Sequence, residues 1–467
     1  MSSVAEALPA VLDRIDADVD KSLNRLFGLL KIQSISTDPA HKQQCREAAE
    51  FVARDLASVG FDANLRPTDG HPVVVAKSAH HRRDGAPRIL FYGHYDVQPV
   101  DPVSLWKSPP FEPRIATSPD GRKMIVARGA SDDKGQLMTF VEACRAFKAV
   151  TGALPLPITM MIEGEEECGS NHLFEFLRNN AAELKQDLAF VCDTSMWDER
   201  TPAITTSLRG LVYEEVRITC ADRDLHSGIF GGAAQNPLRV LAAILAALHD
   251  KTGRVTIPGF YNGVKELPAA VKADLKRLKL SAKEFLGAVG LKVPAGEKNR
   301  MLIEQITTRP TAEINGLIGG YTGDGAKTVI PSHATAKVSF RLVGEQNPEK
   351  IRDAFRAFVR ARLPADAKVE FTSFGVAPAV ALPFDNPALA KARAALADEW
   401  GRKAVTVGEG GSIPIVADFK RVLGMDTIMV GFALDDDRVH SPNEKYDLQS
   451  FHKGMRSWAR ILASLAS

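Results

Sequence analysis

The sequence lacks the features that mark several large classes of protein. Its 467 residues contain five cysteines, which are widely spaced and include no C-x-x-C pair, so a disulfide-built scaffold is excluded. Lys and Arg number 59 and Asp and Glu 57, and the net charge of +2 gives no electrostatic footprint for nucleic acid or for an anionic membrane. No window reaches the roughly 18 apolar residues that a membrane-spanning helix needs.

The N-terminal stretch also lacks an apolar core of the kind that signal peptides carry. Residues 1–31 alternate charged residues with leucines, as an amphipathic helix does. Together with reduced thiols, this predicts a cytoplasmic protein with no membrane and no nucleic-acid partner. What remains is ordinary globular composition, 45% hydrophobic and 25% charged, over a length that suggests two or three domains.

Apolar runs followed by acidic or imidazole residues recur along the chain. These runs cover 89–92, 124–127, 158–162, 188–191 and 427–430. Alternating with helical periods, they predict an α/β domain with a mostly parallel sheet. Because the carboxyl ends of such strands converge, we expect the residues after them to form a site. A helix is expected after Asp133, with Ser131 or Asp132 as its N-cap.

The pattern changes in the middle of the chain, where half-exposed strands alternate polar and apolar residues. The expected elements are strand 211–220, helix 236–250, strands 311–318 and 334–343, helix 348–363 and strand 367–374. This β-α-β-β-α-β order predicts a ferredoxin-like α+β domain inserted into the α/β domain. The predicted boundaries are 1–208 and 378–467 for the α/β domain and 209–377 for the insertion.

Five residues near the ends of the expected strands supply two imidazoles and three carboxylates: His94, Asp132, Glu167, Asp193 and His440. This set contains no thiolate and suits Zn²⁺, Mn²⁺ or Co²⁺. One carboxylate between two such ions can bridge them, and two ions can share a water whose pKa falls from about 15.7 towards about 7. The sequence therefore favours a metal site with two ions.

Two more acidic residues suit supporting roles. Glu166 precedes Glu167 in an expected turn, where neighbouring side chains diverge, so that one can bind metal while the other accepts a proton. Asp96, two residues after His94, suits a hydrogen bond that fixes the imidazole. Taken alone, the acidic run 163–167 is equally typical of a solvated turn before a helix.

Four motifs together resemble one family. They are 93–99 (GHYDVQP), 128–135 (RGASDDKG), 163–170 (EGEEECGS) and 440–444 (HSPNE). In this order, the chain resembles the dinuclear metallopeptidases related to cytosolic non-specific dipeptidase and carnosinase, a group that includes glutamate carboxypeptidase, aminoacylase and succinyl-diaminopimelate desuccinylase. The resemblance implies a catalytic α/β domain and an inserted lid and dimerisation domain.

The resemblance also implies roles for the candidate ligands. His94 and Asp193 would bind one of two divalent ions per subunit, Glu167 and His440 the other, and Asp132 would bridge both. Glu166 would be the general base.

The inserted domain carries a further expected catalytic residue. The segment 224–228 (DLHSG) resembles the family motif whose histidine stabilises the oxyanion in the neighbouring subunit, which implies a homodimer and a role in trans for His226. Without the resemblance, His226 would be interpreted as a residue that ends a strand. The apolar residues of 238–248 could serve a dimer interface or the core of the inserted domain itself.

Substrate contacts are implied in the same way. The residues concerned are Thr328, Arg341, Glu409, Gly411 and Ser412. An arginine suits a substrate carboxylate. Where the comparison leads us to expect another substrate-contacting histidine, the chain has 383–387 (PFDNP), which departs from the family pattern.

The implied activity is hydrolysis of an amide bond in a small substrate with a free carboxylate, in the first place a dipeptide. A metal-bridging hydroxide would attack, with Glu166 as the base. An N-acyl-amino-acid amidohydrolase of the same family is the alternative, although 98–99, 224–232 and 328–331 look more like the dipeptidase branch. A non-catalytic metal-binding protein is a remote alternative, because Glu166 stands beside all five expected ligands.

Overall fold

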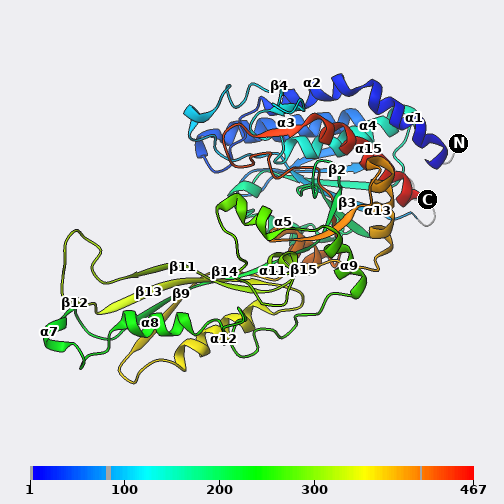
Figure 1. Ribbon diagram of the computed structural model, residues 1–467. Coiled ribbons are helices and arrows are strands. Elements are labelled where there is room, and N and C mark those ends of the chain that lie inside the picture. The colour runs from blue at the N-terminus through cyan, green and yellow to red at the C-terminus, as the bar shows by residue number, and fades with distance from the viewer. Residues whose placement is uncertain (1–3, 80–85, 411–412) are drawn as a thin grey trace. The chain divides into compact units, whose positions relative to one another are not determined.

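The structure, a computed structural model, describes residues 4–79, 86–410 and 413–467. The chain forms two compact units, each visible in Figure 1. The first comprises Met1–Thr206, Leu382–Thr406 and Pro414–Ser467, and the second comprises Ser207–Ala381 and Val407–Ile413. Among the described residues, no helix combines the length and apolar character needed to cross a bilayer.

A large mixed sheet forms the centre of the first unit. Its strands there are β1 (Phe61–Arg66), β2 (Val73–Ser78), β3 (Ile89–His94), β6 (Ile158–Glu163), β7 (Leu188–Val191), β8 (Ala203–Leu208) and β17 (Thr427–Met429). They follow the order β1-β2-β6-β3-β7-β17-β8. The middle strands β6, β3, β7 and β17 pair in parallel, as expected for an α/β domain, whereas β1 and β2 are antiparallel.

Helices cover both faces of this sheet. One face carries α1 (Val4–Ala17), α2 (Val19–Leu30), α3 (Lys42–Val59), α4 (Lys134–Thr151) and α15 (Leu448–Ala466) (Figure 1). The other face carries α5 (Leu173–Asn179) and the π-helix Phe419–Leu423. Adjacent residues of β3 alternate between these layers: Phe91 stacks on Phe140 of α4, and Tyr92 contacts Phe419.

Trp458 of α15 is the largest fully buried side chain of the core. Its ring lies edge-on to Phe140, Phe190 and Phe91, with centroids 5.2, 5.6 and 5.7 Å away. The aromatic side chains of two strands and two helices therefore share one cluster, which fixes β3 and β7 relative to the helices.

The strand before Asp132 does not belong to the large sheet. β5 (Lys123–Val126) lies in a separate antiparallel sheet with β4 (Arg114–Thr117) and β18 (Lys445–Asp447), in the order β18-β5-β4. The expected N-cap was also wrong, because α4 begins after Asp133, which makes no side-chain cap bond. The Ser131 hydroxyl donates instead to Asp437, and Asp132 faces His440.

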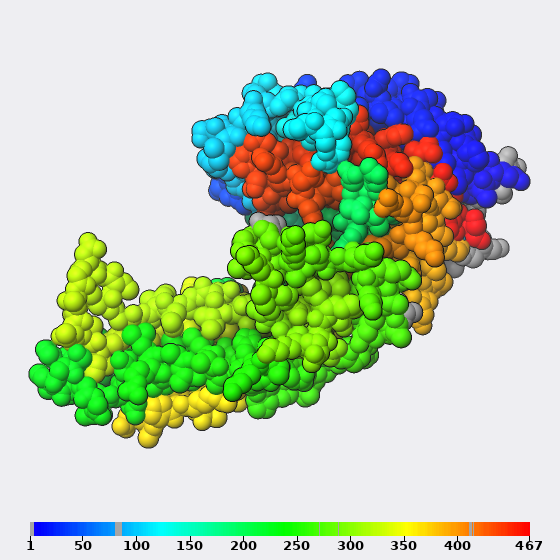
Figure 2. Space-filling view, in the orientation of Figure 1, coloured from blue at the N-terminus to red at the C-terminus, as the bar shows by residue number. Residues whose placement is uncertain are grey.

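The second unit has the predicted ferredoxin-like order. Its main elements are β9 (Gly210–Thr219), α8 (Pro237–Ala246), β11 (Thr311–Gly319), β13 (His333–Leu342), α12 (Pro348–Arg360) and β14 (Lys368–Ala377). The strands pair antiparallel in the order β11-β13-β9-β14, and α8 and α12 pack on the sheet. At one end of this unit lie α7 (Ser227–Phe230) and β12 (Val329–Ile330) (Figure 1, Figure 2).

The apolar side chains of α8 serve the core of this unit. Leu241, Ile244 and Leu245 of α8, and Leu248 just after it, are buried in this core, so they are not available to a partner chain. Exposed apolar side chains of this unit include two on the edge strand β11, Leu317 and Ile318, which are 54% and 61% exposed.

The aromatic cluster predicts a large stability effect. Trp458→Ala should lower the free energy of unfolding by about 3–5 kcal/mol, because it removes a buried indole and leaves a cavity among rings. Denaturant unfolding followed by circular dichroism measures this loss. Val103→Ala, at a side chain that is 55% exposed, is the control and should change the free energy little. Equal losses in the two variants would contradict the assigned core.

Candidate active site

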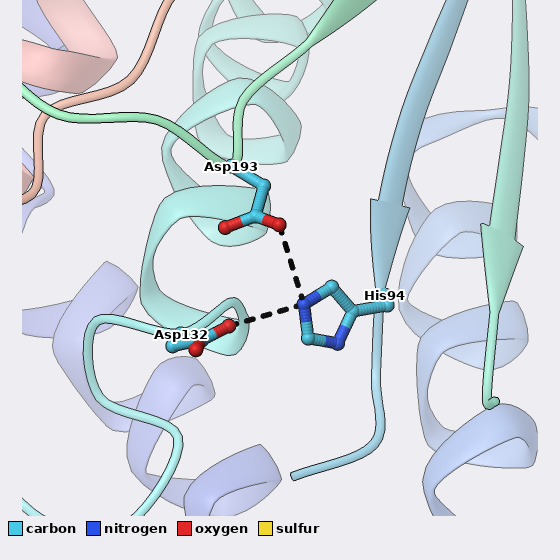
Figure 3. A group of neighbouring side chains, drawn as sticks. All are labelled: His94, Asp132 and Asp193. Atoms are coloured by element: carbon cyan, nitrogen blue, oxygen red, sulfur yellow. Dashed lines mark ion pairs between the residues drawn. The ribbon is translucent and has the colours of Figure 1, made fainter. Parts of the chain in front are cut away.

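Three expected ligands meet at the end of the parallel strands. His94 ends β3, Asp193 follows β7, and Asp132 lies in the loop after β5. His94 Nε2 lies 3.2 Å from Asp132 Oδ1 and 3.8 Å from Asp193 Oδ2 (Figure 3). We call these three residues the His94 group; their donor atoms all lie within 4.8 Å of one another.

A second group of donors shares Asp132 with the first. His440 Nε2 lies 3.0 Å from Asp132 Oδ2 and 3.2 Å from Glu167 Oε2. We call Asp132, Glu167 and His440 the His440 group; these donor atoms also lie within 4.8 Å of one another. The two oxygens of Asp132 thus face two different imidazoles, which is the arrangement that a bridging carboxylate requires.

The donor atoms fit divalent cations. His94 is fully buried, yet among the described residues its Nε2 atom makes no well-aligned hydrogen bond, although Asp132 Oδ1 is 3.2 Å away. An unsatisfied buried polar atom costs roughly 1–3 kcal/mol, and a cation between this nitrogen and the facing carboxylates would remove that cost. Imidazole nitrogens and carboxylate oxygens are ligands that Zn²⁺ and Mn²⁺ accept.

The pKa shifts of the site show that its buried negative charges need compensation. Burial raises the pKa of Asp193 well above its usual range, and the charges of Asp132 and Asp133 raise it further. Hydrogen bonds to Asp132 and Glu167 raise the pKa of His440 to about 10. Bound protons thus compensate the negative charge of the carboxylates here, and divalent cations can take the place of these protons.

Glu166 and Glu167 lie on the 3₁₀ turn Glu166–Cys168 that follows β6. The Glu167 side chain is 3% exposed and faces His440. No hydrogen bond or ion pair to the Glu166 carboxylate is found among the described residues. Burial raises the pKa of Glu166 to about 7, and the charges of Glu167 and Asp132 add to this effect. That the two adjacent side chains diverge stays a prediction.

Asp96 and Gln98, which both follow β3, hold the ligands in place. Asp96 Oδ1 lies 3.3 Å from His94 Nδ1, while Asp96 Oδ2 accepts a hydrogen bond from the Glu167 backbone N–H at 3.1 Å. The Gln98 amide donates to Glu167 Oε2 at 2.7 Å. Sequence reasoning missed this role of Gln98, although the residue belongs to the first motif.

In the second unit, His226 and Thr328 lie together. β10 (Leu225–His226) pairs with β12, so that His226 faces Val329, and the Ser227 N–H donates to the Thr328 carbonyl at 3.0 Å. The Gly228 N–H donates to His226 Nδ1 at 3.0 Å. Because Nδ1 accepts, the proton of the neutral ring lies on the exposed Nε2.

Two other expected substrate residues, Arg341 and Glu409, also belong to this unit. The Arg209 N–H donates to the Glu409 carbonyl at 3.3 Å, and burial together with the charge of Arg341 lowers the pKa of Arg209 to about 10. Arg209, which sequence reasoning missed, therefore lies near Arg341. Gly411 and Ser412 lie outside the described residues.

The stretch 383–387 has a structural use in the first unit. The Asn386 side chain accepts from the Ala388 N–H at 2.9 Å and caps α13 (Pro387–Trp400). The departure from the family pattern thus coincides with a helix start.

Comparison with known proteins identifies relatives of this chain. The family model described as peptidase family M20/M25/M40 matches residues 90–464. The Cys-Gly metallodipeptidase DUG1 of Candida albicans is 30% identical over 482 residues, which cover 98% of this chain and 97% of that protein. The Beta-Ala-His dipeptidase of Homo sapiens is 28% identical over 482 residues, covering 98% of this chain and 93% of that protein.

A solved structure agrees with these relatives. The M20 family metallo-carboxypeptidase Sso-CP2 of Sulfolobus solfataricus superposes with a TM-score of 0.79 at 30% identity, covering 95% of this chain and 99% of that chain. The site described above, with its shared carboxylate, lies in the region that the family model matches. The chain therefore belongs to peptidase family M20/M25/M40.

Proposed function

We propose that this protein is a metallodipeptidase with two divalent cations per subunit. One observation carries the proposal: Asp132 presents one oxygen to each imidazole, with Asp193 completing one group and Glu167 the other. When bound, two Zn²⁺ or Mn²⁺ ions activate a shared water and polarise the carbonyl of the peptide bond. The His94 group and the His440 group would each hold one ion.

The chain's own residues supply the proton transfer. Glu166 accepts a proton from the attacking water and delivers it to the leaving amine. Its carboxylate is suited to this, because no described residue forms a hydrogen bond or ion pair with it and it lies on the same turn as the ligand Glu167. Asp96 keeps the His94 ring oriented through Nδ1.

The second unit carries arginine side chains that can bind a carboxylate of the substrate. Arg209 hydrogen-bonds the Glu409 segment through its backbone N–H, and the charge of Arg341 acts on its guanidinium group. Guanidinium groups bind carboxylates with a forked geometry. A dipeptide carries both a scissile amide and a free carboxylate. The relatives named as dipeptidases support this substrate over the N-acyl amino acids of the alternative.

His226 is suited to stabilise the oxyanion. Its Nε2–H is exposed and available as a donor, because Gly228 occupies Nδ1. Thr328 directly precedes Val329, which pairs with His226, so the two residues are placed to act on the same substrate molecule. If His226 serves the neighbouring subunit, Thr328 serves it too.

A second copy of the chain is the partner that we propose for the second unit. β11 is an edge strand of the four-stranded sheet, and Ile314, Leu317 and Ile318 are 48%, 54% and 61% exposed. Unpaired backbone groups beside exposed apolar side chains favour pairing with another strand. A homodimer through this unit would cover them.

Metal binding should stabilise the protein measurably. Zn²⁺ at about 100 times its dissociation constant should add about 2.7 kcal/mol of stability, because the folded site binds it and the unfolded chain does not. Differential scanning fluorimetry with and without a chelator measures the shift in Tm. Asp132→Asn should lose most of this shift, whereas Asp435→Asn, at an exposed carboxylate, should keep it. A full shift in Asp132→Asn would contradict the shared-ligand assignment.

The substrate class is tested by turnover on free dipeptides and on N-acyl amino acids. The metal-loaded protein should cleave the dipeptides, and a chelator should abolish this activity. Glu166→Gln should lower kcat by about 10²–10⁴-fold while the metal-dependent Tm shift remains, because only proton transfer is removed. Turnover confined to the N-acyl amino acids would transfer the protein to the alternative class, and normal turnover by Glu166→Gln would exclude this base.

Action in trans is tested by mixing two inactive variants. Glu166→Gln and His226→Ala should each be inactive alone. A mixed dimer has one site with an intact Glu166 that receives an intact His226 from the partner, so random mixing should restore about a quarter of the sites. Multi-angle light scattering verifies the dimer. No recovered activity, or a monomeric active enzyme, would contradict the role in trans.

A further inference from the structure

The segment that carries His440 has no regular secondary structure. His440 lies in a turn between β17 and β18, with a backbone φ of 60°, and Arg438 and Asn443 also adopt positive φ values of 58° and 66°. Its side chain is 56% exposed. Such backbone conformations are costly for non-glycine residues, so surrounding contacts must impose them.

One set of contacts comes from Glu444, four residues after His440. Its carboxylate is fully buried. Oε2 accepts from Arg128 Nη1 at 2.8 Å and from the Gly129 N–H at 2.9 Å, and Oε1 accepts from the Ser131 and Asp132 N–H groups at 2.9 and 3.1 Å. Glu444 thus ties the His440 segment directly to the backbone of Asp132.

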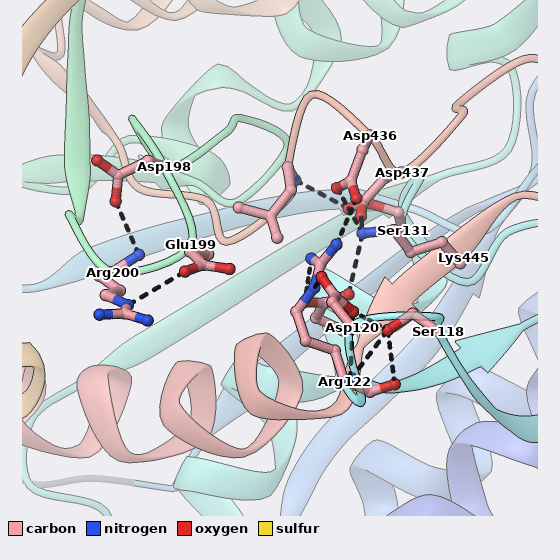
Figure 4. Close-up of polar contacts among 12 residues, drawn as sticks. Ser118, Asp120, Arg122, Ser131, Asp198, Glu199, Arg200, Asp436, Asp437 and Lys445 are labelled. Carbon is pink, nitrogen blue, oxygen red and sulfur yellow. Dashed lines mark hydrogen bonds and ion pairs between the residues drawn. The ribbon is translucent and has the colours of Figure 1, made fainter.

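A second set comes from Asp437, three residues before His440. Asp437 is also fully buried, and its Oδ2 accepts from the Ser131 hydroxyl at 2.7 Å. Lys445 Nζ lies 2.6 Å from Asp437 Oδ1 and 2.6 Å from Asp436, which in turn pairs with Arg122 at 2.8 Å (Figure 4). Two buried carboxylates that flank His440 therefore hold Ser131 from two sides.

The His94 group shares Asp132 and so depends on these contacts through one ligand, whereas its other two ligands do not. His94 ends β3, and Asp193 directly follows Cys192 after β7, so paired strands in the core position both. Only the His440 group combines a ligand on an irregular segment with a ligand on a loop. Its geometry depends on the contacts that join those two segments.

We propose that Glu444 and Asp437 are positioning residues that preform the His440 group by holding His440 against Asp132. This inference rests on the proposed metal function of the two groups. It gives the two cations unequal dependence on the surrounding chain: disrupting these carboxylates displaces two ligands of the His440 group but only the shared Asp132 of the His94 group, and so weakens binding of the cation in the His440 group more.

Glu444→Gln tests the proposal. All four groups around the Glu444 carboxylate are donors, so an amide places an N–H group against donors and releases the Asp132 loop. Isothermal titration of the metal-free protein with Mn²⁺ counts the bound equivalents and their affinities. We expect one equivalent to bind about 10–100-fold more weakly and the other, which loses only the placement of Asp132, to weaken clearly less. Ser131→Ala, a milder change, should weaken the same equivalent less.

The matched control is Glu399→Gln. Glu399 is 4% exposed and accepts from Arg456 and Arg460 at 2.8 Å each, so the change removes an equally buried carboxylate. The control should lower Tm and leave both Mn²⁺ affinities unchanged. Two wild-type affinities in Glu444→Gln, or equal weakening of both, would overturn the positioning role. Fewer than two equivalents in the wild type would instead refute the proposed function.

Discussion

The placement of one carboxylate between two imidazoles is the constraint on which the site depends. Asp132 lies 3.2 Å from His94 through one oxygen and 3.0 Å from His440 through the other. Moving this side chain would disturb both groups at once. The surrounding chain accordingly fixes the Asp132 loop by its backbone, through N–H groups that donate to Glu444, and leaves the carboxylate itself for the site.

The electrostatics of the site explains why the Asp132 loop is held by several hydrogen bonds. Burial raises the pKa values of Asp193 and Glu166, so without cations the cluster favours protonated acids and charged imidazoles. Cations reverse this balance, and a rigid frame reduces the cost of organising ligands around them. In the second unit, one hydrogen bond fixes the tautomer of His226. Because the Gly228 N–H donates to Nδ1, the proton of the neutral imidazole lies on Nε2.

The sequence predicted the parts of this arrangement that depend on local pattern. Strand ends located His94, Glu167 and Asp193, and the alternating middle segment predicted the ferredoxin-like order of the second unit. Long-range pairing was not predictable. β5 has the apolar pattern of a central strand but pairs in a separate sheet with β18, more than three hundred residues away. Asp435, Asp436 and Asp437 are the same residue type in succession, yet only Asp437 is buried, where its carboxylate accepts from the distant Ser131 hydroxyl.

Anomalous diffraction from crystals of the Mn²⁺- or Zn²⁺-loaded protein tests the central claim most directly. The account predicts two anomalous peaks in each subunit, about 3.5–4 Å apart, with one oxygen of Asp132 on each ion. His94 and Asp193 should ligate one peak, and Glu167 and His440 the other. A single peak, or two peaks that do not share Asp132, would contradict the account.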